Sequence, residues 1–222
     1  MGIKSILAKP FAAYIATKVK KDAQQALAHQ ERLFKQLLAK ASQTLFGKDH
    51  SFESIHTYEQ FKTLVPVRDY EGLKTYIDKA VNGEANILWP GKPLYWSKTS
   101  GTTSGVKYIP LTKDSIPYHI NSARNALLCY IAETGNADFV DGKLIFLSGS
   151  PVLEEKNGIP VGRLSGIVNH HVPKYLRKNQ MPSYPTNCIE DWEQKVDAIV
   201  EETFTQNMTL ISGIPPWVQM YF

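Results

Sequence analysis

The sequence contains little cysteine and no long apolar run, and each shortage excludes a class of protein. Cys129 and Cys188 stand far apart, without CxxC or Cys/His ligand spacing, so we expect reduced thiols and neither a disulfide framework nor a zinc site. Lys9 and Pro10 interrupt the short apolar stretch near the start, which argues against a secretory signal, and no window is long enough for a transmembrane helix. These features favour a cytoplasmic protein.

Charge of one sign is also scarce outside the start of the chain. The net charge is +4 over 222 residues, and no run of Lys and Arg is interleaved with aromatic residues as in nucleic-acid-binding surfaces. We therefore expect no nucleic-acid partner. Residues 1–41 hold most of the excess, with eight Lys or Arg against Asp22 and Glu31.

This basic start has the pattern of an amphipathic helix. Its apolar positions are Phe11, Tyr14, Ile15 and Val19, then Phe34, Leu37 and Leu38. Such a stripe suits an anionic membrane surface or a protein core. A helix docked on its own domain is the usual use of the pattern, so we expect core packing and no membrane partner.

The chain has the composition of an ordinary globular protein, with 43% apolar and 21% charged residues. Its first part, residues 1–92, reads as a helical region. Helical spacing covers residues 5–46, with a break near Lys9-Pro10 and an end at Gly47, and two short helices follow between residues 54 and 79. Asn82-Gly83 closes the region as a turn.

The second part, residues 93–222, reads as an α/β region. Leu94-Tyr95-Trp96 and Tyr108-Ile109-Pro110-Leu111 are strand-like runs on either side of a loop, which predicts a hairpin. A helix is expected from residue 114 to about 134. The apolar runs at residues 143–149 and 208–213 are typical of buried strands, and a helix at 192–204 lies between them. We expect an α/β fold with a mixed or parallel sheet flanked by helices.

The loop of the predicted hairpin is unusually rich in hydrogen-bond donors. It runs Lys98-Thr99-Ser100-Gly101-Thr102-Thr103-Ser104-Gly105-Val106-Lys107. Glycines let backbone N–H groups approach an anion, hydroxyls add donors, and Lys107 adds a positive charge. The spacing differs from the P-loop, because Val106 separates Gly105 from Lys107 and Tyr108 follows. A flexible surface turn is the ordinary alternative for a short Ser/Thr/Gly cluster.

The full pattern resembles the phosphate-binding motif of the adenylate-forming superfamily. Closer still is its similarity to the Gretchen Hagen-three family, the auxin-responsive acyl acid amido synthetases of plants and their bacterial relatives. The segments that carry this resemblance are Pro66–Glu71, Pro90–Pro93, Trp96–Pro110, Gly162–Ile167 and Gly213–Trp217. They run over most of the chain.

The resemblance implies a two-step, ATP- and Mg²⁺-dependent activation of a small carboxylic acid, followed by transfer of the acyl group to an amino acid or other amine. It implies Lys107 as the catalytic cation and a set of cofactor-binding residues in the loop, namely Thr99, Ser100, Gly101, Thr102, Thr103, Ser104 and Gly105. The helix after the loop carries Arg124, which suits a substrate carboxylate. A surface role for Arg124 is the alternative.

The same resemblance implies that the chain is the N-terminal part of the enzyme's large domain. Residues 215–222 open like a new helix, and the family's later motifs for adenine, ribose and Mg²⁺ lie beyond Phe222. We expect the remainder of the polypeptide to be a necessary partner and this portion alone to be inactive. An acyl-CoA ligase and a non-catalytic nucleotide- or acyl-binding module remain as alternative functions.

Two other motifs are weaker. His170-His171 suggests a metal, but adjacent residues point apart and no Cys, Asp or Glu at ligand spacing completes a site, so we expect no metal ligand set here. Ser148-Gly149-Ser150 lacks the Gly-x-Ser-x-Gly frame of a nucleophile turn, which disfavours a hydrolase.

Overall fold

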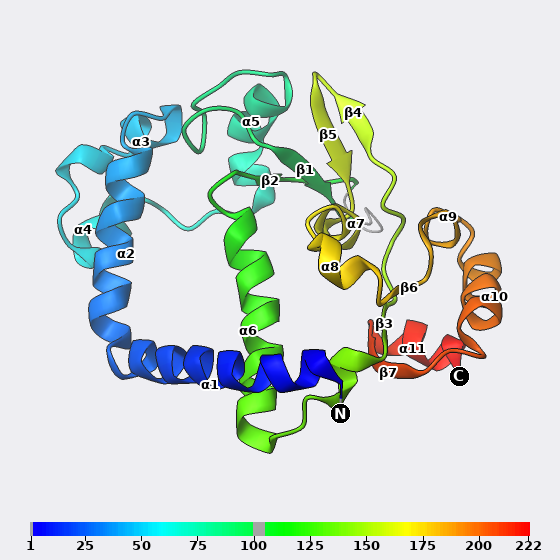
Figure 1. The fold of residues 1–222 in the computed structure, drawn as a ribbon. Helices are drawn as coiled ribbons and strands as arrows, with labels where there is room; N and C mark the ends of the chain where they lie inside the picture. The colour runs from blue at the N-terminus through cyan, green and yellow to red at the C-terminus, as the bar shows by residue number, and fades with distance from the viewer. Residues whose placement is uncertain (1, 100–104) are drawn as a thin grey trace. The chain divides into compact units, whose positions relative to one another are not determined.

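The computed structural model describes residues 2–99 and 105–222, apart from the side chains at positions 174 and 175 (Figure 1). The first part of the chain contains α1 (Ile3–Gln24), α2 (Ala26–Ala41), α3 (Leu45–Asp49), the 3-10 turn η1 (Phe52–Ser54), α4 (Tyr58–Leu64) and α5 (Tyr70–Val81). The strands and remaining helices are β1 (Tyr95–Lys98), β2 (Tyr108–Leu111), α6 (Ile116–Thr134), η2 (Asp138–Asp141), β3 (Lys143–Phe146), β4 (Glu154–Lys156), β5 (Ile159–Gly162), α7 (Leu164–Asn169), α8 (Lys174–Arg177), β6 (Gln180–Met181), α9 (Tyr184–Asn187), α10 (Trp192–Thr203), β7 (Met208–Ser212) and α11 (Pro215–Tyr221).

These elements form two compact units, which are described separately. The first unit comprises Met1–Lys20, Pro117–Leu153 and Gly162–Phe222, and the second comprises Lys21–Ile116 and Glu154–Val161. The domain division at residue 92 made from the sequence stays a prediction.

The second unit is built around a four-stranded sheet with the order β2-β1-β5-β4 (Figure 1). β1 and β2 are antiparallel, with Trp96 opposite Pro110 and Lys98 opposite Tyr108. β4 and β5 form a second antiparallel hairpin. The core of this unit joins α5 to the sheet through Ile77, Ala80, Val81, Ile87, Trp96, Ile159 and Val161. The strand that leads into the loop is therefore anchored by its buried tryptophan.

The first unit contains a three-stranded parallel sheet with the order β6-β3-β7. Ile145 of β3 and Ile199 of α10 are buried in its core, and the Trp192 and Trp217 rings stack with centroids 4.1 Å apart. A second cluster packs α1 against α6 and the segment after it, through Ala12, Ile15, Leu128, Ile131 and Ala137. The expected α/β architecture, with helices flanking mixed and parallel sheets, is confirmed.

Most of the predicted elements are present with bounds close to those expected. The two short helices after residue 54 are α4 and α5, the helix after residue 114 is α6, and that at 192–204 is α10. The hairpin β1–β2 and the strands β3 and β7 are likewise confirmed. The expected burial holds for Leu144 and Ile145 of β3 but is wrong for β7, whose residues are half-buried or exposed.

The predicted helix break at Pro10 and helix end at Gly47 are wrong. Pro10 lies inside α1, which continues to Gln24, and the chain bends at Gln25. Pro10 is exposed, and it lacks the N–H that would donate to the preceding turn of the helix. The helix loses one backbone hydrogen bond at this residue and continues beyond it. Gly47 lies inside α3. Glycine is required at this position because its backbone packs directly on the carbonyl oxygen of Ala41 and leaves no space for a Cβ.

The expectation that the apolar stripe of α1 packs on a core is correct for one residue of the four. Ile15 is buried, whereas Phe11, Tyr14 and Val19 are 47%, 65% and 37% exposed. The other buried residues of α1 are Ser5 and Ala12, whose small side chains allow close contact with the rest of the first unit. Among the described helices, none combines the length and the apolar character needed to cross a membrane.

Candidate functional site

The loop of the β1–β2 hairpin is closed at its base by Thr99 and Lys107. The backbone N–H of Thr99 donates to the carbonyl oxygen of Lys107 at 3.0 Å, and the N–H of Lys107 donates to Thr99 Oγ1 at 3.2 Å. This pair continues the ladder beyond Lys98 and Tyr108. The structure therefore brings together two of the residues that the sequence assigned to phosphate binding.

Five of the assigned loop residues lie outside the described part of the chain, namely Ser100, Gly101, Thr102, Thr103 and Ser104. Their roles stay predictions. Gly105 is described, and its φ of +79° is in the region that residues with a side chain rarely adopt. Apart from its chain neighbours, no atom of the described residues lies within 4 Å of the position of a Cβ, so the positive φ is what favours glycine here.

The Lys107 side chain rests on an aromatic ring. Its Nζ lies 5.3 Å from the centroid of the Tyr70 ring, and the residue is half-buried. Within the described part of the chain, no ion pair involves Lys107, whereas Lys98 at the end of β1 forms one with Glu154. An ammonium on a ring face keeps its N–H groups available to a further acceptor.

Tyr70 also holds the hairpin through its hydroxyl group. The backbone N–H of Tyr108 donates to the Tyr70 hydroxyl oxygen at 2.9 Å. Tyr70 is the first residue of α5, where Asp69 caps the helix by accepting from the N–H of Gly72 at 2.8 Å. The cap fixes the direction in which α5 begins and so the position of the tyrosine.

A second lysine approaches the same strand from the β4–β5 hairpin. Lys156 Nζ lies 4.4 Å from the centroid of the Tyr108 ring and donates to its hydroxyl at 3.3 Å. The turn of this hairpin is Asn157-Gly158, with both residues at positive φ, and Asn157 Nδ2 donates to the carbonyl oxygen of Val81 at 2.7 Å. Sequence reasoning missed this hairpin, although Asn-Gly between short runs is a strong signal for one.

Arg124 lies on α6 in the first unit and is exposed. Its Nε and Nη2 donate to Oδ1 of the neighbouring Asn125 at 3.2 and 3.0 Å. The guanidinium group is thus held by a neutral amide on its own helix. Its assignment to the substrate carboxylate stays a prediction.

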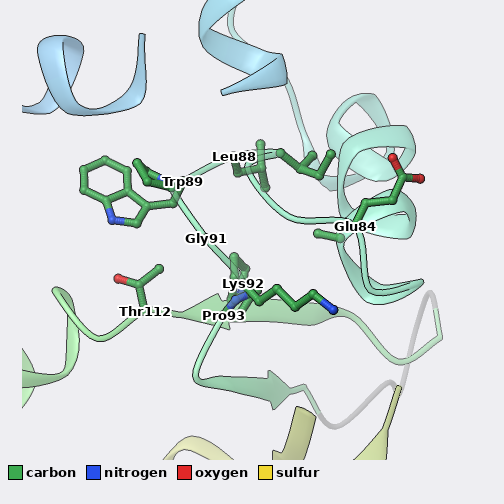
Figure 2. Close-up of a pocket in the computed structure, with 11 residues that line it drawn as sticks. Glu84, Leu88, Trp89, Gly91, Lys92, Pro93 and Thr112 are labelled. Atoms are coloured by element: carbon green, nitrogen blue, oxygen red, sulfur yellow. The ribbon is translucent and has the colours of Figure 1, made fainter. Parts of the chain in front are cut away.

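A small pocket lies beside the hairpin, lined by the loop between α5 and β1 and by Thr112 after β2 (Figure 2). Its lining includes Glu84, Trp89 and Lys92. The volume of about 20 Å³ accommodates roughly one water molecule, so this pocket is too small for a nucleotide.

The turn Ser148-Gly149-Ser150 has a structural role. The Ser148 carbonyl oxygen accepts from Nζ of Lys195 at 3.1 Å, and the Gly149 N–H donates to Ser165 Oγ at 3.2 Å. Lys195 is 2% exposed and also donates to the Asn187 carbonyl oxygen at 2.6 Å. Burial lowers the pKa of Lys195 to about 8. The buried ammonium therefore joins the turn after β3 to the segment before α10.

The two adjacent histidines form no metal site in the described residues, where no group of three or more His, Cys, Asp or Glu side chains is placed to hold an ion. The His170 ring donates from Nε2 to the carbonyl oxygen of Pro151 at 2.7 Å. Burial, and next the nearby His170, lower the pKa of His171. A neutral imidazole at this position fits its partly buried surroundings.

The sequence of the chain matches one family model and is similar to two curated proteins. The family model described as "GH3 family N-terminal domain" matches residues 15–200. Indole-3-acetic acid-amido synthetase GH3.15 of Arabidopsis thaliana is 42% identical over 65 residues, which cover 28% of this chain and 11% of that protein. Jasmonoyl-L-amino acid synthetase JAR4 of Nicotiana attenuata is 25% identical over 127 residues, covering 55% and 22%.

Two solved structures share the fold. The GH3.15 acyl acid amido synthetase aligns with a TM-score of 0.67 at 18% identity, over 82% of this chain and 32% of that one. The same enzyme in complex with 2,4-DB aligns with a TM-score of 0.67 at 19% identity, over 83% and 33%. The chain thus spans about a third or less of the length of each of these proteins.

Proposed function

The chain belongs to the GH3 family, the Gretchen Hagen-three family, and on this basis we propose that it supplies the phosphate-binding hairpin of an ATP-dependent acyl acid amido synthetase. The observation that carries the proposal is the pairing of Thr99 with Lys107 at the base of a glycine- and hydroxyl-rich loop. The Lys107 ammonium there rests on a ring and not on a carboxylate. A cation held in this way is suited to triphosphate oxygens.

The proposed reaction has two steps. A carboxylate oxygen of the acid attacks the α-phosphorus of ATP, and pyrophosphate leaves to give an acyl adenylate. The amine nitrogen of the second substrate then attacks the acyl carbon, so that an amide forms and AMP leaves. Mg²⁺ bound to the triphosphate would neutralise part of its charge. Positioning and charge stabilisation dominate such transfers, and Lys107 and the loop donors are suited to both.

The substrates proposed are a small carboxylic acid and an amino acid or other amine. The names of the relatives support this class, since one is an indole-3-acetic acid-amido synthetase, another is a jasmonoyl-L-amino acid synthetase, and one of the two solved structures is a complex with 2,4-DB. We place the enzyme in the cytoplasm, because Cys129 and Cys188 are both free thiols.

The test is ATP–pyrophosphate exchange on the product of the complete reading frame, with a panel of aryl and alkyl carboxylic acids. We expect exchange that requires an acid, followed by amide formation when amino acids are added. Thioester formation with coenzyme A and no amide would assign the enzyme to the acyl-CoA ligases. ATP binding without exchange under any acid would indicate a non-catalytic module.

Arg124 is proposed to pair with the substrate carboxylate, because its guanidinium group hydrogen-bonds to the neutral Asn125 amide, forms no ion pair among the described residues and presents a planar donor pair. Arg124→Ala should then raise the Michaelis constant of the preferred acid by about tenfold or more, the effect of losing one charge-assisted pair. Arg32→Ala, at an exposed position of α2, is the matched control. Unchanged Michaelis constants for every acid in the panel would assign Arg124 to the surface.

A further inference from the structure

We propose that Tyr70 is a positioning residue that holds Lys107 at the base of the phosphate-binding loop. The proposal rests on the function proposed above and adds to it a residue from a different helix. Two separate contacts carry it. The Tyr70 ring lies beneath the Lys107 ammonium at 5.3 Å, and the Tyr70 hydroxyl accepts from the backbone N–H of Tyr108 at 2.9 Å.

The two contacts act on neighbouring residues of one strand. The hydroxyl fixes the backbone where β2 begins, and the ring fixes the side chain that precedes it. Because Lys107 is also joined to Thr99 through its backbone, its main chain is held from two sides. The freedom left to Lys107 is that of its long side chain, and this is the freedom that the Tyr70 ring restricts.

An aromatic ring is a suitable partner for a lysine that must bind phosphate. Lys98 shows the contrast, since it is paired with the Glu154 carboxylate and its charge is neutralised by that partner. The face of a phenol ring attracts the ammonium without accepting a conventional hydrogen bond from it. The three N–H groups of Lys107 therefore stay available to the oxygens of a triphosphate.

Tyr70 itself is firmly placed. It begins α5, whose N-cap Asp69 is hydrogen-bonded, and it packs against the core cluster that contains Ile77 and Trp96. The tyrosine ring beneath the lysine therefore packs against the core of the second unit and does not have to be ordered when a ligand binds. Preorganisation of this kind reduces the cost of placing a charge on the transition state.

A double-mutant cycle on acid-dependent ATP–pyrophosphate exchange tests the proposal, using the product of the complete reading frame. Tyr70→Leu removes ring and hydroxyl, and should lower kcat by about tenfold in a wild-type background. In the Lys107→Ala background the same change should cost no more than about twofold, because the group it positions is gone. Tyr70→Phe keeps the ring and should recover most of the loss in kcat.

Tyr76 provides a matched control on the same helix. It packs against the same core cluster, and its hydroxyl donates to Asp49 Oδ2 at 2.8 Å, whereas among the described residues the Lys107 ammonium lies over the ring of Tyr70. Tyr76→Leu should lower the thermal midpoint of unfolding, and its effect on kcat should be the same with and without Lys107. This comparison separates positioning from general loss of stability.

The outcomes distinguish this inference from the proposed function. If Lys107→Ala slows exchange but the effects of Tyr70→Leu and Lys107→Ala multiply independently, Tyr70 does not position the lysine and the inference is overturned alone. The same holds if Tyr76→Leu shows equal coupling to Lys107. If Lys107→Ala leaves exchange unchanged, the phosphate-binding role of the loop lysine is wrong and the inference is overturned with it.

Discussion

Replacing Lys107 by Ala in the product of the complete reading frame should lower the rate of acid-dependent ATP–pyrophosphate exchange by about 30- to 1000-fold. This corresponds to a loss of about 2 to 4 kcal/mol of transition-state stabilisation, the size expected for removing one preorganised donor to developing charge. The structure gives the reason that the loss should be large. Lys107 is a half-buried residue at the base of the loop, and no ion pair among the described residues neutralises its ammonium group.

Lys113→Ala is the matched control, because Lys113 is an exposed lysine shortly after β2. Its removal should change exchange by less than about twofold, since an exposed charge is screened by solvent and salt. Lys107→Arg keeps the positive charge but changes its shape, so partial recovery is expected. A normal exchange rate for Lys107→Ala would remove the lysine from the catalytic site.

The parts of this fold that could be predicted from the sequence are those whose signals are local. Helix α5 is preceded by the breaker Pro66, starts at a capping aspartate and is followed by the turn Asn82-Gly83, and each of these acts over a few residues. The β1–β2 hairpin has strand-favouring residues on both sides of a loop rich in small residues. Propensity and turn chemistry were sufficient for these elements.

Where the sequence misled, contacts between distant residues decide the structure. A glycine after a helical pattern ordinarily marks an end, but Gly47 is required because its backbone packs on Ala41. The exposed and buried sides of α1 could not be separated by hydrophobicity, because Ser5 and Ala12 are buried while Tyr14 is exposed. Small side chains such as Ser and Ala are only weakly hydrophobic, so a helix face that packs through them cannot be recognised from the spacing of apolar residues.

The candidate site shows the same division. The loop was recognisable from its own residues, and Thr99 and Lys107 do meet at its base. Tyr70 could not have been assigned to the site, because it precedes Tyr108 by 38 positions and its type alone gives no reason to expect a lysine above its ring. The hairpin that carries Lys156 could have been predicted, since Asn157-Gly158 is a typical hairpin turn.

Trp96→Ala should produce the largest loss of stability of any substitution considered, about 3 to 5 kcal/mol of unfolding free energy for the second unit. Trp96 is fully buried, belongs to the core cluster with Ile77 and Val161, and meets the Tyr108 ring edge to face at 6.4 Å between centroids. Removing the indole leaves a cavity between α5 and the sheet. The cost combines the lost burial of a large apolar surface with the incomplete collapse of that cavity.

Two further variants identify the source of this loss when urea unfolding is followed by far-ultraviolet circular dichroism. Trp89→Ala is the control, because Trp89 is half-buried and its Nε1 donates to Asp114 Oδ2 at 2.9 Å, so it should cost less than about 2 kcal/mol. Trp96→Phe should cost roughly half as much as Trp96→Ala or less, since it keeps a ring in the core. It also removes a buried indole N–H that has no acceptor among the described residues, which offsets part of the lost packing. Equal losses for Trp96→Ala and Trp89→Ala would mean that the core of this unit does not depend on Trp96, and that the strand leading into the loop is anchored elsewhere.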